Sequence, residues 1–71
     1  MMREVVITHE PVELYKILKF ESLVDSGGQA KTVIADGLVL VNGAVETRKR
    51  RKILSRDVIR FAGEELKIRL G

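Results

Sequence analysis

The stretch SGGQAKTVIADGLVLVNGAV, residues 26–45, predicts a helix followed by a β-hairpin. Ser26 and Gln29 have the spacing of a capping box, in which the serine hydroxyl accepts a hydrogen bond from the third helical amide and the glutamine side chain reaches back to the helix start. Apolar residues follow at helical spacing: Ala30, Val33 and Ile34. Asp36-Gly37 is expected to end the helix, because glycine readily takes the left-handed conformation needed after the last turn.

Two hairpins are expected after this helix. Asn42-Gly43 favours a type I′ turn, because both residues tolerate a positive φ and short apolar runs flank them. A second turn is centred on Gly63. The four strands of these hairpins are expected at Leu38–Val41, Ala44–Thr47, Val58–Phe61 and Leu66–Leu70.

A strand and another helix are expected before this stretch. The strand covers Glu4–Thr8, and the helix covers Pro11–Lys19, because proline fits the first helical turn and apolar residues recur at helical spacing from Leu14. Thr8 or His9 is expected to cap this helix. The connector should pack against the core through Phe20, Leu23 and Val24. These elements predict an α+β domain, in which a helix-loop-helix unit packs on a small antiparallel sheet of hairpins.

Length and composition limit the class of protein. The 71 residues predict a single domain, residues 1–71. The chain has no cysteine, and no apolar run approaches the roughly 18 residues that suggest a membrane-spanning helix. The start of the chain has no apolar signal core. We therefore predict a cytoplasmic protein, a monomer without a membrane partner.

The sequence offers no catalytic or metal-binding constellation. His9 is the only histidine, and a zinc site needs three or four converging nitrogen or sulfur ligands. The serines stand in no nucleophile motif, and no phosphate-binding loop ending in Gly-Lys-Ser/Thr is present. We predict that the protein is not an enzyme and that it has no cofactor and no metal.

The five consecutive basic residues of the segment Arg48–Lys52 are the strongest functional signal. The chain has 13 lysines and arginines and 10 acids, so the rest of it has eight basic residues against ten acids, a net charge of −2. Such an asymmetry suggests a surface that binds a polyanion. If the strand continued straight, Val45 and Ile53 would face the core together with Lys49 and Arg51, which cannot be buried unpaired. We therefore expect the strand to end near Arg48 and the basic run to form an exposed loop.

The residues from the second helix to the hairpin resemble the S4-like RNA-binding domain. That family has a Ser-Arg-x-x-Ala-Lys helix start, a glycine and a Val-x-Val-Asn-Gly hairpin. The matching positions are Ser26, Ala30, Lys31, Ile34, Gly37, Val39, Val41, Asn42 and Gly43. Leu14–Lys19 looks like the family's first helix and Asp57–Ile59 like its later strand, so the resemblance covers roughly residues 13–69. GAVETRKR, residues 43–50, is similar to the family's small stand-alone YbcJ-like branch.

The resemblance implies a helix pair and sheet, the S4-like (alpha-L) fold, that binds structured RNA with one basic face. The chain differs from the family pattern at Gly27 and Glu13, where the family has arginine, at Tyr15, where it has aspartate, and at Ala35, where a basic residue is common. Much of the positive charge lies instead in the basic run. The predicted RNA-binding residues are Lys16, Lys19, Lys31, Arg48, Lys49, Arg50, Arg51 and Lys52.

The sequence also allows other interpretations of the basic run. It could be a solvated charge run, a nuclear localisation signal, a site for an acidic protein partner or a non-specific polyanion site, and charge alone does not separate RNA from DNA. RNA is favoured because the guanidinium group of arginine binds phosphate through two parallel hydrogen bonds. The family resemblance implies ribosomal RNA or tRNA as the partner, with the ribosome as a further candidate. We expect serine at Arg48, Lys49, Arg50 and Arg51 to leave the fold intact.

Overall fold

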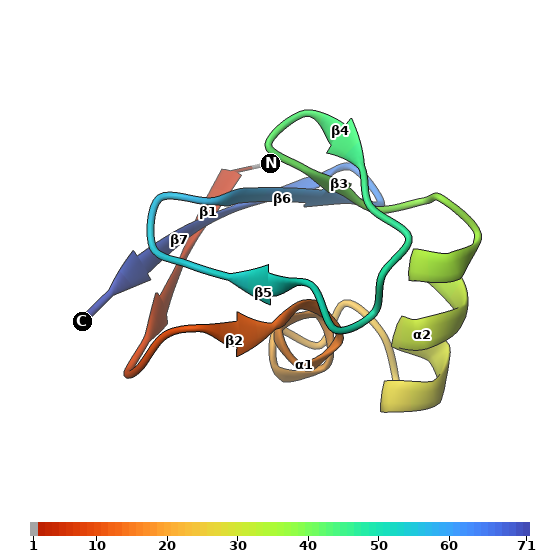
Figure 1. The fold of residues 1–71 in the computed structure, drawn as a ribbon, viewed down its shortest axis with the longest axis horizontal. Helices are drawn as coiled ribbons and strands as arrows, with labels where there is room; N and C mark the ends of the chain where they lie inside the picture. Colours follow the sequence, from red (N-terminus) through yellow and green to blue (C-terminus); the bar gives the residue numbers. More distant parts are fainter. Residues whose placement is uncertain (1) are drawn as a thin grey trace.

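The computed structural model describes residues 2–71, and it places two helices against a five-stranded mixed sheet (Figure 1). The strand order in this sheet is β1-β7-β6-β3-β4, and β2 and β5 form a separate two-stranded sheet. The elements are β1 (Met2–Ile7), β2 (Val12–Glu13), α1 (Leu14–Phe20), α2 (Gly27–Ala35), β3 (Leu40–Val41), β4 (Ala44–Val45), β5 (Lys52–Ile53), β6 (Val58–Phe61) and β7 (Glu64–Leu70). The predicted α+β class is confirmed.

The sheet is mixed because its first and last strands run parallel. β1 pairs with β7 from Met2 opposite Glu65 to Ile7 opposite Leu70, and the other pairs in the sheet are antiparallel. The sequence indicated a purely antiparallel sheet, and this part of the prediction is wrong. The second hairpin, β6–β7, is confirmed, although β7 begins at Glu64, two residues before the predicted start. Its turn residues, Ala62 and Gly63, have φ angles of 52° and 79°.

Helix α2 follows the local signals closely. The Ser26 hydroxyl oxygen accepts a hydrogen bond from the Gln29 amide at 3.1 Å. The Gln29 side-chain oxygen accepts one from the Asp25 amide at 2.6 Å, so it reaches one residue further back than in the predicted box. The helix ends at its C-cap Asp36, and Gly37 has a φ of 77°. Both ends of α2 are therefore fixed by residues next to them in the sequence.

Helix α1 is shorter than predicted, and its start was assigned wrongly. Pro11 lies before it, and Val12–Glu13 forms the strand β2, which pairs with β5. Glu13 is the N-cap residue and makes no side-chain capping bond, so neither Thr8 nor His9 caps the helix. Val12 is buried through the pairing with Ile53, and this tertiary contact replaces the first predicted helical turn. Phe20 was expected in the core but is 69% exposed.

The first hairpin has the predicted turn but shorter strands. Asn42 and Gly43 have φ angles of 53° and 84°, as a type I′ turn requires. The Asn42 side chain also donates to Asp57 at 3.0 Å and accepts from the Val58 amide at 2.9 Å, which joins the turn to β6. Val45 was expected to face the core but is 58% exposed. The next residue, Glu46, is the buried one.

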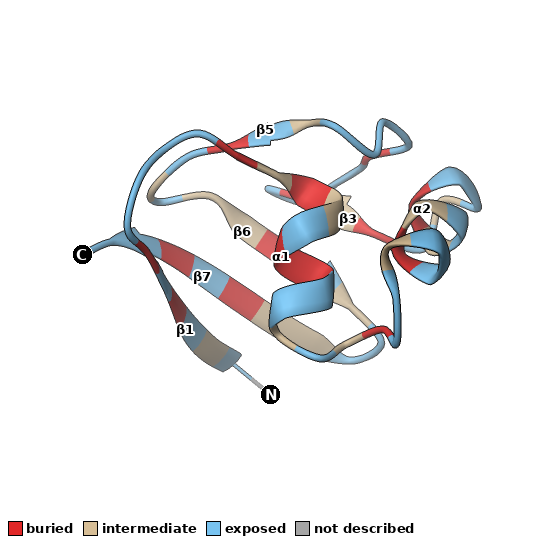
Figure 2. Cartoon of the chain, turned by 90° about the horizontal axis from the view of Figure 1, so that it is seen from below, coloured by how far each residue is buried: buried red, intermediate tan, exposed pale blue. Residues whose placement is uncertain are grey.

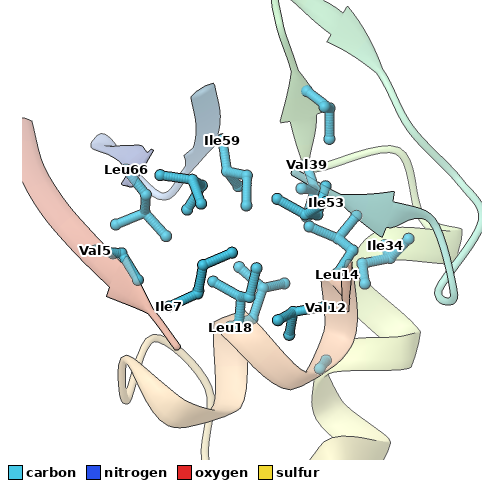
Figure 3. Packing of buried hydrophobic residues seen from close by; sticks show 14 of the residues in the cluster. Val5, Ile7, Val12, Leu14, Leu18, Ile34, Val39, Ile53, Ile59 and Leu66 are labelled. Atoms are coloured by element: carbon cyan, nitrogen blue, oxygen red, sulfur yellow. The ribbon is translucent and has the colours of Figure 1, made fainter. Parts of the chain in front are cut away.

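The core lies between the sheet and the two helices (Figure 3). Figure 2 shows buried and exposed residues alternating along β7, as expected for a strand with one covered face. Helix α1 contributes three buried apolar side chains, and α2 contributes two. The fully buried large side chains are Leu14, Ile17, Leu18, Ile34, Val39, Ile53, Ile59, Leu66 and Ile68.

Candidate nucleic-acid interface

The segment between β4 and β5, which contains most of the basic run, packs on the start of α1. The amide of Leu14 donates to the carbonyl oxygen of Arg51 at 2.9 Å, and the amide of Tyr15 donates to that of Lys49 at 3.1 Å. The first amides of a helix have no partner inside the helix, so these carbonyls complete its hydrogen bonding. Lys52 lies in β5, opposite Glu13. The run is thus a loop, as predicted, but its backbone is fixed to α1 and β2.

Glu46 holds two arginines of the run through its carboxylate. Arg48 donates from its backbone amide and Nε to Oε2 and from Nη2 to Oε1, each at 3.0 Å. Arg51 donates from Nη1 to Oε1 at 2.7 Å. The Glu46 side chain is only 8% exposed, whereas that of Arg48 is 72% exposed. The carboxylate is therefore an internal anchor that orients two surface guanidinium groups.

The pKa of Glu46 reflects this arrangement. The hydrogen bond from the Arg48 side chain, together with those from the Arg48 backbone and from Arg51, outweighs the effect of burial and lowers the pKa of the carboxyl from 4.5 to about 2. Glu46 is thus ionised at neutral pH, although it is buried. The same contact raises the pKa of Arg48. Without these two arginines, the fold would contain a buried carboxylate lacking its cationic partners.

A second carboxylate links the run to α1. Glu13 lies 3.2 Å from the Lys16 ammonium nitrogen and 3.4 Å from Nη1 of Arg50. The Lys16 hydrogen bond is the main cause of the lowered pKa of Glu13, and Arg50 adds to it. Both contacts are solvent-exposed, so they contribute little stability. They nevertheless bring Lys16, a predicted RNA-binding residue on α1, next to the basic run.

Tyr15 connects α1 with α2 beside this cluster. Its ring centroid lies 5.4 Å from the ammonium nitrogen of Lys31 and 6.0 Å from that of Lys16. A β-carbon added at Gly27 would lie 3.9 Å from Cδ2 of the Tyr15 ring, so the ring packs on the first turn of α2. Two of the positions at which the chain differs from the family pattern, Tyr15 and Gly27, therefore lie next to each other.

Four members of the run surround a shallow hollow, which we call the loop hollow. Its volume is about 400 Å³, and its lining residues are Arg48, Arg50, Arg51 and Lys52. Lys16 and Lys31 join this cluster through Glu13 and Tyr15, so the structure brings together six of the predicted residues. The carbonyl of Lys49 accepts the hydrogen bond from the Tyr15 amide, and the Lys49 side chain is exposed. Lys19 lies a turn further along α1, and none of these contacts includes it.

Sequence reasoning missed the two residues that organise this surface, Glu46 and Tyr15. One signal for Glu46 was available, because it is the only acid between Asp36 and Asp57 and lies two residues before the start of the basic run. Tyr15 had no comparable signal, since its position beside Gly27 depends on how the two helices pack. Among residues 2–71, no group of three or more histidine, cysteine, aspartate or glutamate side chains could hold a metal ion. Within the same range, no helix is long and apolar enough to cross a membrane.

Comparison with known proteins identifies the family. The model of the S4 domain family matches residues 5–69. The chain therefore belongs to the S4 domain family, as residues 26–45 had predicted. Its relatives include the "Putative RNA-binding protein YbcJ" of Escherichia coli K12, which is 50% identical over 60 residues, 84% of this chain and 86% of that protein.

A second relative and a solved structure agree with this assignment. The "Probable ribosome maturation protein RlbA" of Bacillus subtilis 168 is 33% identical over 63 residues, 89% of this chain and 89% of that protein. The solution structure of YbcJ from E. coli superimposes with a TM-score of 0.68 at 44% identity, covering 96% of this chain and 85% of that chain. It is described as revealing an "alfaL motif involved in RNA-binding". The predicted alpha-L fold and the YbcJ-like branch are confirmed.

Proposed function

We propose that this chain is a non-catalytic, monomeric RNA-binding protein, a single domain that binds structured RNA, ribosomal RNA or tRNA, through the loop hollow and the lysines beside it. The observation that carries the proposal is the loop hollow itself, in which four basic side chains meet and a buried carboxylate orients two of them. The names of the relatives, an RNA-binding protein and a ribosome maturation protein, support the same class of partner.

The geometry suits phosphate groups. An arginine side chain has five N–H donors, and Glu46 uses only some of those of Arg48 and Arg51. The others are available for phosphate oxygens, which accept bidentate hydrogen bonds from guanidinium groups. Because the loop backbone is already bonded to α1, the loop needs little ordering on binding. Phosphate binding at this site therefore begins from a largely preformed surface.

Folded RNA fits this surface better than an unpaired strand. Proteins that bind single strands stack successive bases on exposed aromatic rings. The chain has only three aromatic residues, Tyr15, Phe20 and Phe61, and Tyr15 is partly buried against the core. Recognition of double-helical RNA depends mainly on its shape, its phosphates and its 2′-hydroxyls. A rigid cluster of cations meets these requirements.

The proposal is tested by fluorescence anisotropy with labelled tRNA at several salt concentrations. Neutralising four to six phosphates should give a slope of log affinity against log salt of roughly −3 to −5. The variant combines Lys49→Ser, Arg50→Ser and Lys52→Ser, which removes three cations but keeps both partners of Glu46. Its slope should be flatter by roughly two to three units. The matched single-site comparison is Lys52→Ser against Arg60→Ser, because Arg60 is an exposed strand cation outside the loop hollow.

The outcomes separate the proposed function from its rivals. RNA binding through the loop predicts that Lys52→Ser weakens tRNA binding and that Arg60→Ser does not. Unlabelled tRNA and ribosomal RNA should compete better than duplex DNA and heparin. Equal competition by all four would indicate a non-specific polyanion site. A triple variant that stays folded and binds tRNA with the affinity and slope of the parent would refute the loop as the binding surface. A parent protein that does not bind tRNA would refute the proposed function and leave an acidic protein as the candidate partner.

A further inference from the structure

A second hollow lined by cations lies away from the basic run, and we call it the strand hollow. Its volume is about 410 Å³, and its lining residues are Glu4, Ser55, Arg56, Lys67, Ile68, Arg69 and Leu70. Three cations and one carboxylate give it a formal charge of +2. Within residues 2–71, Arg56 and Lys67 form no ion pair, and Arg69 has a loose one with Glu4, at 3.5 Å between Nε and Oε1.

The strand hollow is formed by β7, by the turn before β6 and by Glu4 of β1. Leu66 and Ile68 point into the core, so Lys67 and Arg69 lie on the other face of β7 and are exposed. The turn is joined to this strand by two backbone hydrogen bonds. The Arg56 amide donates to the Ile68 carbonyl at 2.8 Å, and the Ile68 amide donates to the Asp57 carbonyl at 2.9 Å. The three cations are therefore attached to one rigid unit of backbone.

Arg56 has an unusual backbone conformation at this site. Its φ is 77°, in the left-handed region where a residue with a β-carbon is disfavoured. It occupies the third position of a turn closed by a hydrogen bond from the Asp57 amide to the Leu54 carbonyl at 3.2 Å, where glycine is the favoured residue when φ is positive. The arginine therefore does not improve the turn. Its side chain instead adds a positive charge to the strand hollow.

The two hollows lie toward opposite ends of the molecule. In Figure 1 the turn at residues 54–57 is at the left end and the loop at residues 46–51 is toward the right, beside α2. Figure 2 gives the same order from a second direction. The molecule is 30 Å long, so a single nucleotide cannot occupy both sites. A ligand that reaches both needs repeated phosphates along an extended or folded backbone.

We propose that the strand hollow, with Arg56, Lys67 and Arg69, is a second RNA-backbone contact, which binds another segment of the RNA held by the loop hollow. This inference rests on the proposed function. It gives the protein two separated points of attachment and identifies its ligand as an RNA large enough to span them. The two sites lie on different elements: the first on β5 and the loop before it, the second on β1, β7 and the turn before β6. Each can therefore be altered without changing the other.

The test uses labelled tRNA and a double variant, Arg56→Gly with Lys67→Gln. Glycine suits the φ of residue 56, and Lys67 is exposed, so the fold should be retained. The loss of two phosphate contacts should flatten the salt slope by about 1.5 and weaken binding about tenfold near physiological salt. The matched comparison for charge is Lys67→Gln against Arg60→Gln, because Arg60 is an exposed cation on the neighbouring strand β6 and lies outside the hollow.

The results distinguish this inference from the proposed function. It is supported if the double variant loses affinity and slope, Lys67→Gln weakens binding and Arg60→Gln does not. It fails, while the proposed function stands, if variants of the basic run weaken tRNA binding and the double variant binds like the parent. It also fails if Arg60→Gln weakens binding as much as Lys67→Gln, since the effect would then be one of total charge. A parent protein that does not bind tRNA would overturn both.

Discussion

Replacing Glu46 with glutamine should destabilise the fold at neutral pH and have a smaller effect in acid. The carboxylate is buried and accepts hydrogen bonds from the side chains of Arg48 and Arg51. Glutamine has nearly the same shape but no charge, and its amide nitrogen cannot accept a hydrogen bond from a guanidinium group. The variant therefore removes the attraction to two cations and leaves the rest of the core unchanged.

The magnitude follows from the pKa of Glu46. A fall from 4.5 to about 2 would correspond to about 3 kcal/mol of stability if all of it appeared in the folding free energy. The Arg48 side chain is 72% exposed and the Arg51 side chain is 33% exposed, so water screens part of the attraction. We expect Glu46→Gln to lower the free energy of unfolding by about 1–2 kcal/mol at pH 7.

The pH dependence has a definite sign. The pKa of Glu46 is lower in the folded state, so its stabilising effect is complete above the ordinary value of 4.5 and is lost as the pH falls toward 2. The glutamine variant lacks this titration. The difference in unfolding free energy between parent and variant should therefore be constant from pH 7 to about 5.5 and fall by about half at pH 3. Urea denaturation followed by circular dichroism measures both curves.

The control for this prediction is Glu65→Gln. Glu65 pairs with Arg60 at 3.6 Å on the surface, with side-chain exposures of 35% and 60%, and its loss should change stability by less than about 0.5 kcal/mol. A Glu46 variant as stable as the parent at pH 7 would refute the anchoring role of this carboxylate. A stability difference that did not change with pH would also refute it, because the loss would then come from packing and not from charge.

Substitutions at three other positions test the local structure by urea denaturation. Ser26→Ala should cost about 1 kcal/mol because it removes the cap of α2, and an unchanged midpoint would contradict that role. Asn42→Ala should cost about 1–2 kcal/mol, because alanine disfavours a positive φ and loses the hydrogen bonds to β6. Asn42→Gly should cost less, because glycine accepts a positive φ. Equal losses in the two variants would count against a contribution from the backbone conformation of residue 42. Arg56→Gly should leave stability unchanged or raise it by up to about 1 kcal/mol, and a clear loss would show that the arginine supports the turn.

The structure also changes which variants can test RNA binding. The sequence suggested that four serines at residues 48–51 would leave the fold intact, since none of these residues is in the core. The contacts of Arg48 and Arg51 with the buried Glu46 argue against this, because their loss would leave a buried charge without its partners. Lys49 and Arg50 have no such partner among the buried groups of residues 2–71. They are the safer sites for testing phosphate contacts.

Local signals in the sequence determined α2 and the turns of both hairpins. The Ser26 cap, Gly37 and the Asn42-Gly43 turn depend on residues a few positions apart, so their hydrogen bonds and φ angles follow from the local chain. The charge excess of the basic run was equally visible in the sequence, because it needs no knowledge of neighbours in space. The family resemblance extended these local signals to the alpha-L fold.

The tertiary structure alone decided the features that join distant segments. The parallel pairing of β1 with β7 and the strand β2 depend on partners about forty to sixty residues away, and tertiary pairing there overrode the local helix signal at Pro11. The anchoring role of Glu46 has the same origin. Its strand ends at Val45, which places the glutamate inward and the valine outward, opposite to the expected alternation. The sequence thus determined which charges the protein carries, whereas packing decided which of them form internal ion pairs and which are available to bind a ligand.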